Sequence, residues 1–491
     1  MDVLSDIVGF LNTALWTWLM TPLLLGAGIY FTIRLKFLQI TGFPHMIKVM
    51  AHSGHTEHGG ISSFGAFATS LAARVGTGNI AGVATALVVG GPGAVFWMWV
   101  VAFIGMCTAM IEATLAQVYK HRDEDEPALF RGGPAYYMKR GLNSRAMGVA
   151  FSIALLLAFG LAFNGVQANS IAAAADEAWG INKGVTGTLV LIAVALVIFG
   201  GIRRIAHVAE FVVPIMAVTY LAVGLLVVFA NLSEVPDALA LIVKSAFGVG
   251  EVAGGVIGYT IAQAIQNGAK RGLFSNEAGQ GSAPNAAATA DVDHPTVQGY
   301  VQSLGVFVDT IIICTTTALI ILLSGVYVGG FASDGTYNTD NPTGVALTQN
   351  ALADSVGAWG KPFIAVALVF FAFTSILANY YYGETSLLFI NNGNHRQLVV
   401  LRIAVLFMIM FGALVNASLI WDMADVAMGI MALLNLVAIL ILGRVAFAVI
   451  DDYNAQRRAG EHPRFSRTTI PSITDGIEAD VWNEEPSRSV R

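Results

Sequence analysis

The sequence is poor in charged residues. Only 12% of its 491 residues are Asp, Glu, Lys or Arg, whereas a soluble domain carries about 25%. The hydrophobic share is 56% and the mean hydropathy is +0.68, so the apolar residues are too many for a single core. These values exclude a soluble enzyme, a nucleic-acid-binding protein and a secreted scaffold, and they predict a polytopic integral membrane protein.

Other features are scarce or absent. The two cysteines, Cys107 and Cys314, lie in apolar stretches, so no disulfide framework is expected. The net charge of −6 argues against a polyanionic partner, and residues 1–6 lack the basic start of a cleavable signal peptide. No GxxxxGKS or GxxxxGKT motif occurs, which argues against transport driven by ATP. Because no metal-ligand spacing or nucleophile–base pair is apparent either, we expect neither an enzyme nor an organic cofactor.

Long apolar runs dominate the rest of the chain. A helix that crosses a bilayer needs about 20 mostly apolar residues. By that criterion we predict an all-α protein with eleven transmembrane helices, at about Ala14 to Ile33, Ser63 to Val89, Ala94 to Tyr119, Met147 to Ala174, Gly184 to Phe199, Ala206 to Asn231, Gly254 to Phe274, Val297 to Leu323, Pro362 to Phe389, Leu398 to Val415 and Met423 to Val445. Two shorter stretches, Pro236 to Phe247 and Gly344 to Val356, are predicted to be interfacial helices.

The basic residues predict the orientation in the membrane. All but three of the 26 Lys and Arg residues lie in or near the loops that follow odd-numbered spans, or in the tail; the exceptions are Lys183, Lys244 and Lys361. Positive charge is enriched in cytoplasmic loops. We therefore expect a multi-pass protein of the cell membrane with its N-terminus outside and its C-terminus in the cytoplasm. Residues 451–491, which are polar and lack helical periodicity, are expected to form a mobile cytoplasmic tail.

Two of the spans carry residues that disfavour a helix. The second contains Gly76-Thr77-Gly78-Asn79, and the seventh contains Gln266-Asn267-Gly268. Glycine destabilises a helix interior, and Thr and Asn compete for backbone hydrogen bonds. We predict a broken helix at both places. The alternative is that the small residues only allow close packing between helices.

The two predicted breaks lie five spans apart. That spacing is expected of a transporter built from inverted repeats, with its site at the membrane midplane. The predicted divisions are residues 1–62 (first span and loop), 63–231 (first repeat), 232–450 (second repeat) and 451–491 (tail). The N-terminal end of a half-helix can hold a carboxylate, and freed carbonyls at Gly76 and Thr77 can ligate sodium.

Polar side chains follow one face of several spans. In the ninth span Thr374, Ser375 and Asn379 share a face, and the two hydroxyls are suitable sodium ligands if they face a broken helix. The alternative is that they bond the carbonyls of their own helix. Similar faces carry Phe163, Asn164 and Gln167 in the fourth span, and Gln263, Gln266 and Asn267 in the seventh. Because buried amides need partners, these faces are expected to meet a ligand or to hold the bundle together.

Three acidic residues lie away from the ends of predicted spans: Glu112, Asp309 and Glu384. Intramembrane acids are candidates for a functional role. Asp309 is the deepest and therefore the best candidate for a charge relay or gate, and the alternative is a structural pairing with a neighbouring side chain.

Several long stretches resemble the alanine or glycine:cation symporter family. The most specific is GGPGAVFWMWVVAFIG at Gly90 to Gly105. Others are RVGTGNIAGV at Arg74 to Val83, RGLFSNEAGQGSAP at Arg271 to Pro284, FTSILANYYYGE at Phe373 to Glu384 and WDMAD at Trp421 to Asp425. Together they run from about residue 60 to 445, which is the whole predicted membrane core.

The resemblance implies a leucine-transporter-like fold, with a five-plus-five inverted repeat and one extra N-terminal span. It also implies sodium-coupled import of a small neutral amino acid. By the same resemblance Thr77, Gly78 and Asn79 would contact the amino and carboxylate groups of the substrate. Phe163 would be an aromatic lid, and Thr374 and Ser375 would ligate sodium.

One position departs from the family pattern. Members that carry alanine-type substrates often have Gly-Trp where this chain has Ala378-Asn379. An amide in place of an indole enlarges the pocket and adds a donor and an acceptor, so we expect import of alanine, glycine or glutamine. Proton coupling through Asp309, Glu112 or Glu384 is the alternative. A cation channel is disfavoured, because the two broken spans differ in sequence and occur once each.

Overall fold

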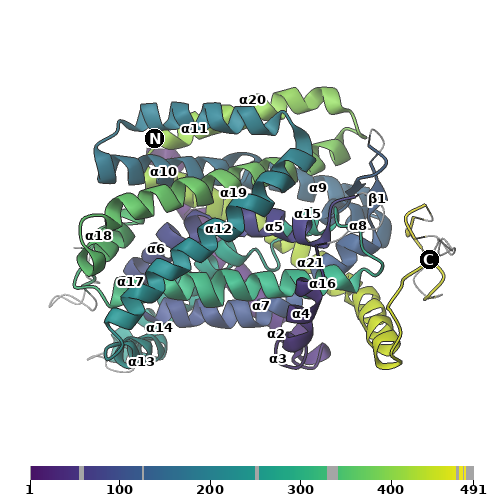
Figure 1. Cartoon of the computed structure of the whole chain (residues 1–491), viewed down its shortest axis with the longest axis horizontal. Coiled ribbons are helices and arrows are strands. Elements are labelled where there is room, and N and C mark those ends of the chain that lie inside the picture. Colours follow the sequence, from purple (N-terminus) through teal and green to yellow (C-terminus); the bar gives the residue numbers. More distant parts are fainter. Residues whose placement is uncertain are drawn as a thin grey trace.

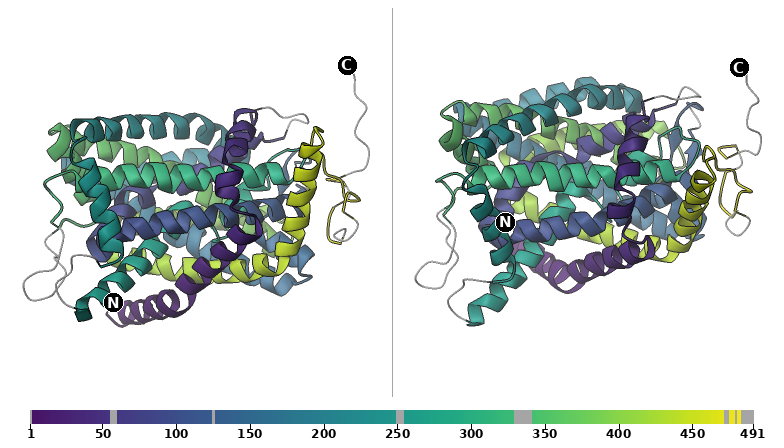
Figure 2. Two further views of the ribbon diagram at one scale, coloured as in Figure 1. Left: turned by 90° about the horizontal axis from the view of Figure 1, so that it is seen from below. Right: turned by 60° about the horizontal axis from the view of Figure 1, so that its bottom comes forward.

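The computed structural model is a bundle of long, roughly parallel helices (Figures 1 and 2). It describes residues 2–54, 60–123, 126–248, 254–328, 341–470, 475–478 and 480–482, and the side chains of these except at 2–8 and 254–259. Figure 1 shows α13 and α18 at one end of the bundle and β1 and α8 at the other. We call these ends the α13 side and the tail side.

Eight helices in the described residues are long and apolar enough to cross a membrane. Three of them combine α-helical pieces with a π-helical segment: α1 (Asp2–Leu15), η1 (Trp16–Met20) and α2 (Thr21–Arg34); α9 (Arg145–Leu155), η3 (Leu156–Ala162) and α10 (Phe163–Trp179); and α16 (Thr296–Val306), η4 (Phe307–Cys314) and α17 (Thr315–Leu322). The other five are α7 (Gly93–Val118), α12 (Gly201–Ala230), α19 (Gly360–Ile390), η5 (His395–Gln397) with α20 (Leu398–Leu414), and α21 (Ala417–Arg458).

A ninth candidate span is bent. It consists of α5 (Ser63–Arg74), η2 (Gly78–Gly82) and α6 (Val83–Gly90), and its two halves differ in direction by 46°. The break lies at Val75 to Thr77, where Val75 leaves the helical region with φ −80° and ψ 87°. The prediction of a broken second span is confirmed.

Two further predicted spans correspond to helices that do not meet the same length and hydropathy criteria. They are α11 (Lys183–Ile198), with 16 residues, and α14 (Gly254–Asn276), with 23. The count of eleven spans therefore stays a prediction. The remaining elements are short: α3 (Leu38–Thr41), α4 (Phe43–Ala51), β1 (His121–Arg122), β2 (Phe130–Arg131), α8 (Pro134–Gly141), α13 (Val235–Ala246), α15 (Ala283–Ala287) and α18 (Val345–Val356), with β1 and β2 antiparallel.

The predicted position of the second break is wrong. Helix α14 continues through Gln266-Asn267-Gly268. Asn267 donates its amide to the Gln263 carbonyl oxygen of the same helix at 2.9 Å, and a Cβ on Gly268 would lie 2.5 Å from the Cβ of Trp97 on α7. Asn267 thus bonds within its own helix and Gly268 allows close packing on α7, as in the alternative interpretation of the small residues. The helix ends instead at Asn276, and Gly279 and Gly281 follow with φ of 95° and 87° before α15.

The described part of the C-terminal tail is not free, so the expectation of a mobile tail is wrong there. Phe465, Ile477 and Trp482 are buried, and the rings of Phe465 and Trp482 pack edge to face at 5.3 Å. The indole nitrogen of Trp482 donates to the Gln117 carbonyl oxygen at 3.3 Å. The tail therefore folds back onto the end of α7.

Candidate functional site

The break in the bent span is in direct contact with α19. The Ser375 hydroxyl donates to the carbonyl oxygens of Ala72 (2.8 Å) and Phe371 (3.0 Å). Ala72 lies in the last turn of α5, where carbonyls have no partner within their own helix. A Cβ on Gly76 would lie 2.5 Å from the Ser375 hydroxyl oxygen, so a larger residue there would displace that hydroxyl. The structure thus brings Ser375, Gly76 and a freed carbonyl together.

Thr374 is oriented differently from Ser375. Its hydroxyl donates to the carbonyl oxygens of Phe370 (3.1 Å) and Phe371 (3.0 Å) in its own helix. A hydroxyl that donates in this way keeps its lone pairs as acceptors. Thr374 can therefore still contribute an oxygen beside Ser375.

A glutamine side chain caps the second half of the broken helix. Gln167 on α10 accepts hydrogen bonds from the Thr77 backbone amide (3.1 Å) and the Thr77 hydroxyl (2.9 Å) through one oxygen. The Asn79 side-chain oxygen accepts from the Gly76 amide at 2.9 Å. These two amides lie at the N-terminal end of the half-helix, where a carboxylate is stabilised. The side-chain oxygens of Gln167 and Asn79 thus accept hydrogen bonds from the amides at this helix end.

Asp309 is joined to the same break. Its carboxylate accepts from the Asn79 amide (2.6 Å), the Ser275 hydroxyl (2.8 Å) and the Thr310 hydroxyl (2.7 Å). Asn79 also donates to the Ser275 hydroxyl oxygen at 3.0 Å. All of these side chains are buried, and the three donors are uncharged. The cluster joins the bent span, the end of α14 and the π-helical segment η4.

Four aromatic rings run in a row past this cluster. Phe159 stacks on Phe163 at 4.3 Å, Phe163 stacks on Phe274 at 4.5 Å, and Phe274 lies 4.8 Å from Trp421. A Cβ on Gly78 would contact the Phe274 ring at 3.0 Å. Phe163 therefore lies in the middle of an aromatic layer against the broken helix, as a lid would.

Asn164 and Asn379 form a second polar pair. The Asn379 amide donates to the Asn164 side-chain oxygen at 3.1 Å, and the Asn164 amide donates to the carbonyl oxygens of Phe159 and Gly160 in η3. The Asn379 side-chain oxygen is buried and has no hydrogen-bond partner in the described structure. Asn379 lies one helical turn from Ser375, so an unused acceptor lies close to the break.

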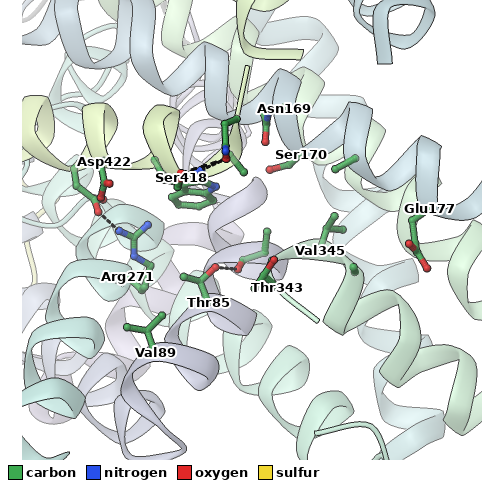
Figure 3. Close-up of a pocket in the computed structure, with 18 of the residues that line it drawn as sticks. Thr85, Val89, Asn169, Ser170, Glu177, Arg271, Thr343, Val345, Ser418 and Asp422 are labelled. Atoms are coloured by element: carbon green, nitrogen blue, oxygen red, sulfur yellow. Dashed lines mark hydrogen bonds and ion pairs between the residues drawn. The ribbon is translucent and has the colours of Figure 1, made fainter. Parts of the chain in front are cut away.

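A cavity of about 810 Å³ opens on the α13 side (Figure 3). It is lined by parts of α6, α10, α14 and the start of α21. Trp421 forms part of its wall and is also the last ring of the aromatic row. The last ring of the aromatic row therefore faces this cavity, which Ala81 of η2 also lines.

Four predicted binding residues are not brought to this cluster. Gln266 donates to the Thr17 hydroxyl of the first span, Gln263 accepts from Asn267, and Gly268 packs on α7. Asn267 lines the cavity near Gly90, at the far end of α6. Ser275 joins the cluster instead, although no feature of the stretch RGLFSNEAGQGSAP distinguishes it as a binding residue.

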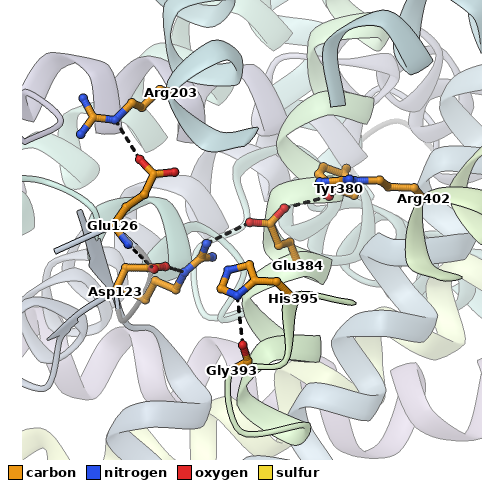
Figure 4. Close-up of polar contacts among 9 residues, drawn as sticks. Asp123, Glu126, Arg203, Tyr380, Glu384, Gly393, His395 and Arg402 are labelled. Atoms are coloured by element: carbon orange, nitrogen blue, oxygen red, sulfur yellow. Dashed lines mark hydrogen bonds and ion pairs between the residues drawn. The ribbon is translucent and has the colours of Figure 1, made fainter. Parts of the chain in front are cut away.

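The other two intramembrane acids have partners of their own. Arg131 pairs with Asp123 and, at 3.0 Å, with Glu384, which also accepts from the Tyr380 hydroxyl at 2.8 Å (Figure 4). Glu112 accepts from the amide of Asn435. Glu384 thus ties α19 to strand β2 on the tail side.

Burial alters the titration of groups at the tail side, outside the spans. It lowers the pKa of His121 to about 4, and the nearby Arg140 adds to this effect. Burial also lowers the pKa of Lys120 to about 7. The Lys120 ammonium lies over the rings of Phe130 (4.0 Å) and Trp482 (4.8 Å), so this face holds its basic groups in apolar surroundings.

Comparison with known proteins gives a consistent result. A model of the sodium:alanine symporter family matches residues 1–467. The chain is 46% identical over 478 residues to the "Probable sodium/glutamine symporter GlnT" of Bacillus subtilis (strain 168), covering 97% of this chain and 96% of that protein. It is 40% identical to the "Sodium/alanine symporter AgcS" of Methanococcus maripaludis, covering 93% and 99%.

A solved structure shares the fold. The crystal structure of MhsT in complex with L-phenylalanine aligns with a TM-score of 0.55 over 79% of this chain and 97% of that chain, at 14% identity. MhsT is a transporter of the leucine-transporter-like fold.

Proposed function

Because the chain belongs to the sodium:alanine symporter family, we propose that it imports a small neutral amino acid together with sodium. It is a multi-pass membrane transporter and not an enzyme. The observation that carries the proposal is the contact of Ser375 with the freed carbonyl of Ala72 at the break in the second span.

That contact suits a sodium ion. Sodium is a hard cation that prefers oxygen ligands, and an ion between α5 and α19 would replace the hydrogen bond from Ser375 to Ala72. The proposed ligands are the hydroxyls of Thr374 and Ser375 with backbone oxygens at the break, including those of Gly76 and Thr77. Sodium would thereby fix the angle between the broken span and α19.

The proposed substrate site adjoins this ion site. The substrate carboxylate would accept from the amides and hydroxyl at Thr77, Gly78 and Asn79, in place of Gln167. Phe163 would cover the bound substrate. Since ion and substrate share one helix break, each would raise the affinity for the other by the same factor.

The side chain of the substrate would extend toward Asn164 and Asn379. The unused oxygen of Asn379 supports acceptance of an amide side chain, because a bound donor would remove the cost of an unpaired buried acceptor, about 1–3 kcal/mol. We therefore propose alanine, glycine and glutamine as substrates.

The proposed architecture has eleven spans. Residues 63–231 and 232–450 would form the two inverted repeats after an N-terminal region at 1–62, with a tail at 451–491. The N-terminus and the α13 side would face outward, and the tail side would face the cytoplasm. In the alternative function the coupling ion is a proton. Asp309 favours it, because it is buried and bonded to Asn79 at the break.

Uptake into proteoliposomes tests the proposal. Labelled alanine should accumulate under an imposed inward sodium gradient, and unlabelled glycine and glutamine should compete. With potassium in place of sodium the expected uptake is zero. Accumulation that follows a pH gradient without sodium would replace sodium coupling by proton coupling, and single-channel currents would point to a channel.

A further inference from the structure

The first span ends in a surface of exposed basic side chains. Arg34 is the last residue of α2, and Lys36 follows it in the turn to α3. Lys48 of α4 and Arg444 of α21 complete the group, and all four side chains are exposed. Among the residues that the structure describes, none of the four forms an ion pair with an acid. We call these four side chains the basic surface.

Acidic residues are absent from the segments that form the basic surface. Residues 7–56 supply α2, α3 and α4, and residues 426–450 supply the facing part of α21; neither range contains Asp or Glu. The two segments are in contact, because the Arg34 guanidinium lies 4.9 Å from the centre of the Phe447 ring. Phe447 lies three residues after Arg444, so the two share one face of α21. The basic surface therefore extends across both spans.

Helix α4 lies across the long helices of the bundle and not along them, as both views of Figure 2 show in purple. It packs on the span that contains α16 and η4, where the rings of Phe43 and Phe307 are 4.8 Å apart. Its Met46 is fully buried, whereas Ile47 is 52% exposed and Lys48 is exposed. A short amphipathic helix in this orientation is typical of one that lies in the membrane interface.

Three apolar side chains beside the basic surface are exposed as well: Ile33 (61%), Phe37 (49%) and Ile40 (61%). The turn that carries them is held in place, because the Cys107 thiol of α7 donates to the Gln39 side-chain oxygen at 2.9 Å. Apolar side chains favour the acyl region of a bilayer, and basic side chains favour the level of the phosphates. The presence of both kinds on one turn fits the boundary between these two layers.

We infer that the basic surface binds the headgroup of an anionic phospholipid in the leaflet at the tail side. The lipid phosphate binds Arg34 and Lys36, Arg444 and Lys48 add positive charge beside it, and an acyl chain lies along Ile33. Charge-assisted hydrogen bonds from Arg and Lys are the strong contacts that phosphates make in proteins. The exposed apolar side chains favour a lipid over a soluble polyanion, because water would otherwise surround them. The site shares no residue with the cluster at the break and goes beyond the proposed transport.

Charge determines which lipids the basic surface selects. Phosphatidylglycerol carries one negative charge, whereas phosphatidylcholine joins a choline cation to the same phosphate and is neutral. The basic surface attracts the first lipid and repels the choline of the second. Each basic residue near an anionic membrane surface raises the affinity about fivefold. Loss of two such residues should therefore lower the affinity at least tenfold.

Lipid binding by the intact protein tests the inference. The purified full chain in a mild detergent is titrated with equal amounts of phosphatidylglycerol and phosphatidylcholine, and the bound lipids are counted by mass spectrometry of the intact protein. The wild type should bind phosphatidylglycerol at least tenfold more tightly than phosphatidylcholine. R34Q/K36Q should weaken phosphatidylglycerol binding at least tenfold. K48Q/R444Q leaves the turn unchanged, and it should weaken the same binding if R34Q/K36Q is misfolded.

R204Q/R396Q is the matched control. Arg204 of α12 and Arg396 of η5 are exposed basic residues of other spans, so this variant loses the same charge and should bind phosphatidylglycerol like the wild type. Equal affinities in the wild type and both test variants, or an equal loss in the control, would overturn the site. Equal binding of the two lipids would overturn selection by charge. Displacement of phosphatidylglycerol by glycerol 3-phosphate alone would indicate a site for a soluble anion and would overturn the assignment to a lipid.

Discussion

At the scale of single residues, the hydroxyl of Ser375 links the two helices that would enclose the ion. Ser375 lies on α19, and its hydroxyl donates to the Ala72 carbonyl oxygen at the end of α5 as well as to Phe371 in its own helix. Its removal leaves the helices in place but takes away one oxygen.

Ser375→Ala should therefore weaken sodium activation more than it weakens folding. We expect the sodium concentration for half-maximal uptake to rise at least tenfold, which corresponds to about 1.4 kcal/mol. Ser355→Ala is the matched control, because the Ser355 hydroxyl bonds only its own helix on α18. An unchanged sodium dependence in Ser375→Ala would contradict the proposed ion site.

Asn379→Ala should change the order of substrates. Removing the unused oxygen leaves nothing to accept a hydrogen bond from an amide side chain, so the concentration of glutamine that halves alanine uptake should rise about tenfold. Alanine affinity should change less than twofold, which makes alanine the internal control. A parallel loss for both substrates would assign Asn379 a purely structural role.

His121 predicts how stability depends on pH. Burial lowers its pKa to about 4 in the folded state, whereas the unfolded value is about 6.5. The unfolded chain therefore binds more protons between these values, and stability is lost as the pH falls from about 6.5 to about 4. His121→Gln should reduce that loss by about 3 kcal/mol, seen as a flatter pH dependence of the thermal midpoint. His52→Gln, at an exposed position, should keep the wild-type slope.

At the scale of elements, the two helix breaks show what sequence can and cannot predict. The break in the second span follows from four consecutive residues that disfavour a helix, so it is a local property. In the seventh span Gln266-Asn267-Gly268 has a similar composition. Gly268 instead allows close contact with α7, and helix α14 continues through these residues. The actual end of α14, at Asn276, lies eight residues after Gly268.

Contacts between distant parts of the chain could not be predicted either, because they depend on tertiary packing. Asn79 and Asp309 are 230 positions apart, and Asn79 and Ser275 are 196 apart. Nothing in the local pattern of either partner reveals such a pair. The tail anchors Phe465, Ile477 and Trp482 are likewise too widely spaced to show a period, and only their partners in the folded protein give them a role.

Gly281 tests the turn that follows α14. Its φ is 87°, and a Cβ there would lie 2.8 Å from Asn435 and 2.9 Å from Phe151. Gly281→Ala should lower the free energy of unfolding by about 2 kcal/mol or more. Gly180 has a similar φ of 65°, but a Cβ there would lie in open space. Gly180→Ala should therefore lower the free energy of unfolding by only about 1 kcal/mol. Equal losses in the two variants would mean that packing around Gly281 is loose.

At the scale of the whole molecule, the tail connects parts of the chain that are far apart in sequence. Glu478 pairs with Arg140 on α8 at 2.7 Å, and the Phe465 amide donates to the Asp293 carbonyl oxygen at 2.9 Å. Trp482 reaches Gln117 and Lys120 at the end of α7. Residues of the C-terminal tail thus pack against the tail side of the bundle.

Trp482→Ala should release this tail. Loss of a buried indole costs about 3–5 kcal/mol, so tryptic cleavage after Arg464 or Arg467 should become at least thirtyfold faster while the membrane core stays intact. Trp179→Ala, at an exposed position, should cleave like the wild type. Equal cleavage rates for all three proteins would show that Trp482 does not hold the tail.

The π-helical segments have a consequence for how such a protein changes over time. The segments η2, η3 and η4 lie in three different spans, and a π-turn holds one more residue than an α-turn of the same span. Deleting that residue would restore a regular α-turn and leave the rest of the span in register, so only the side chains of the segment itself would change direction. The three spans can therefore lose a residue at Gly78–Gly82, Leu156–Ala162 or Phe307–Cys314 without a break in the helix. We expect relatives to differ in length at these three places more readily than elsewhere in the same spans.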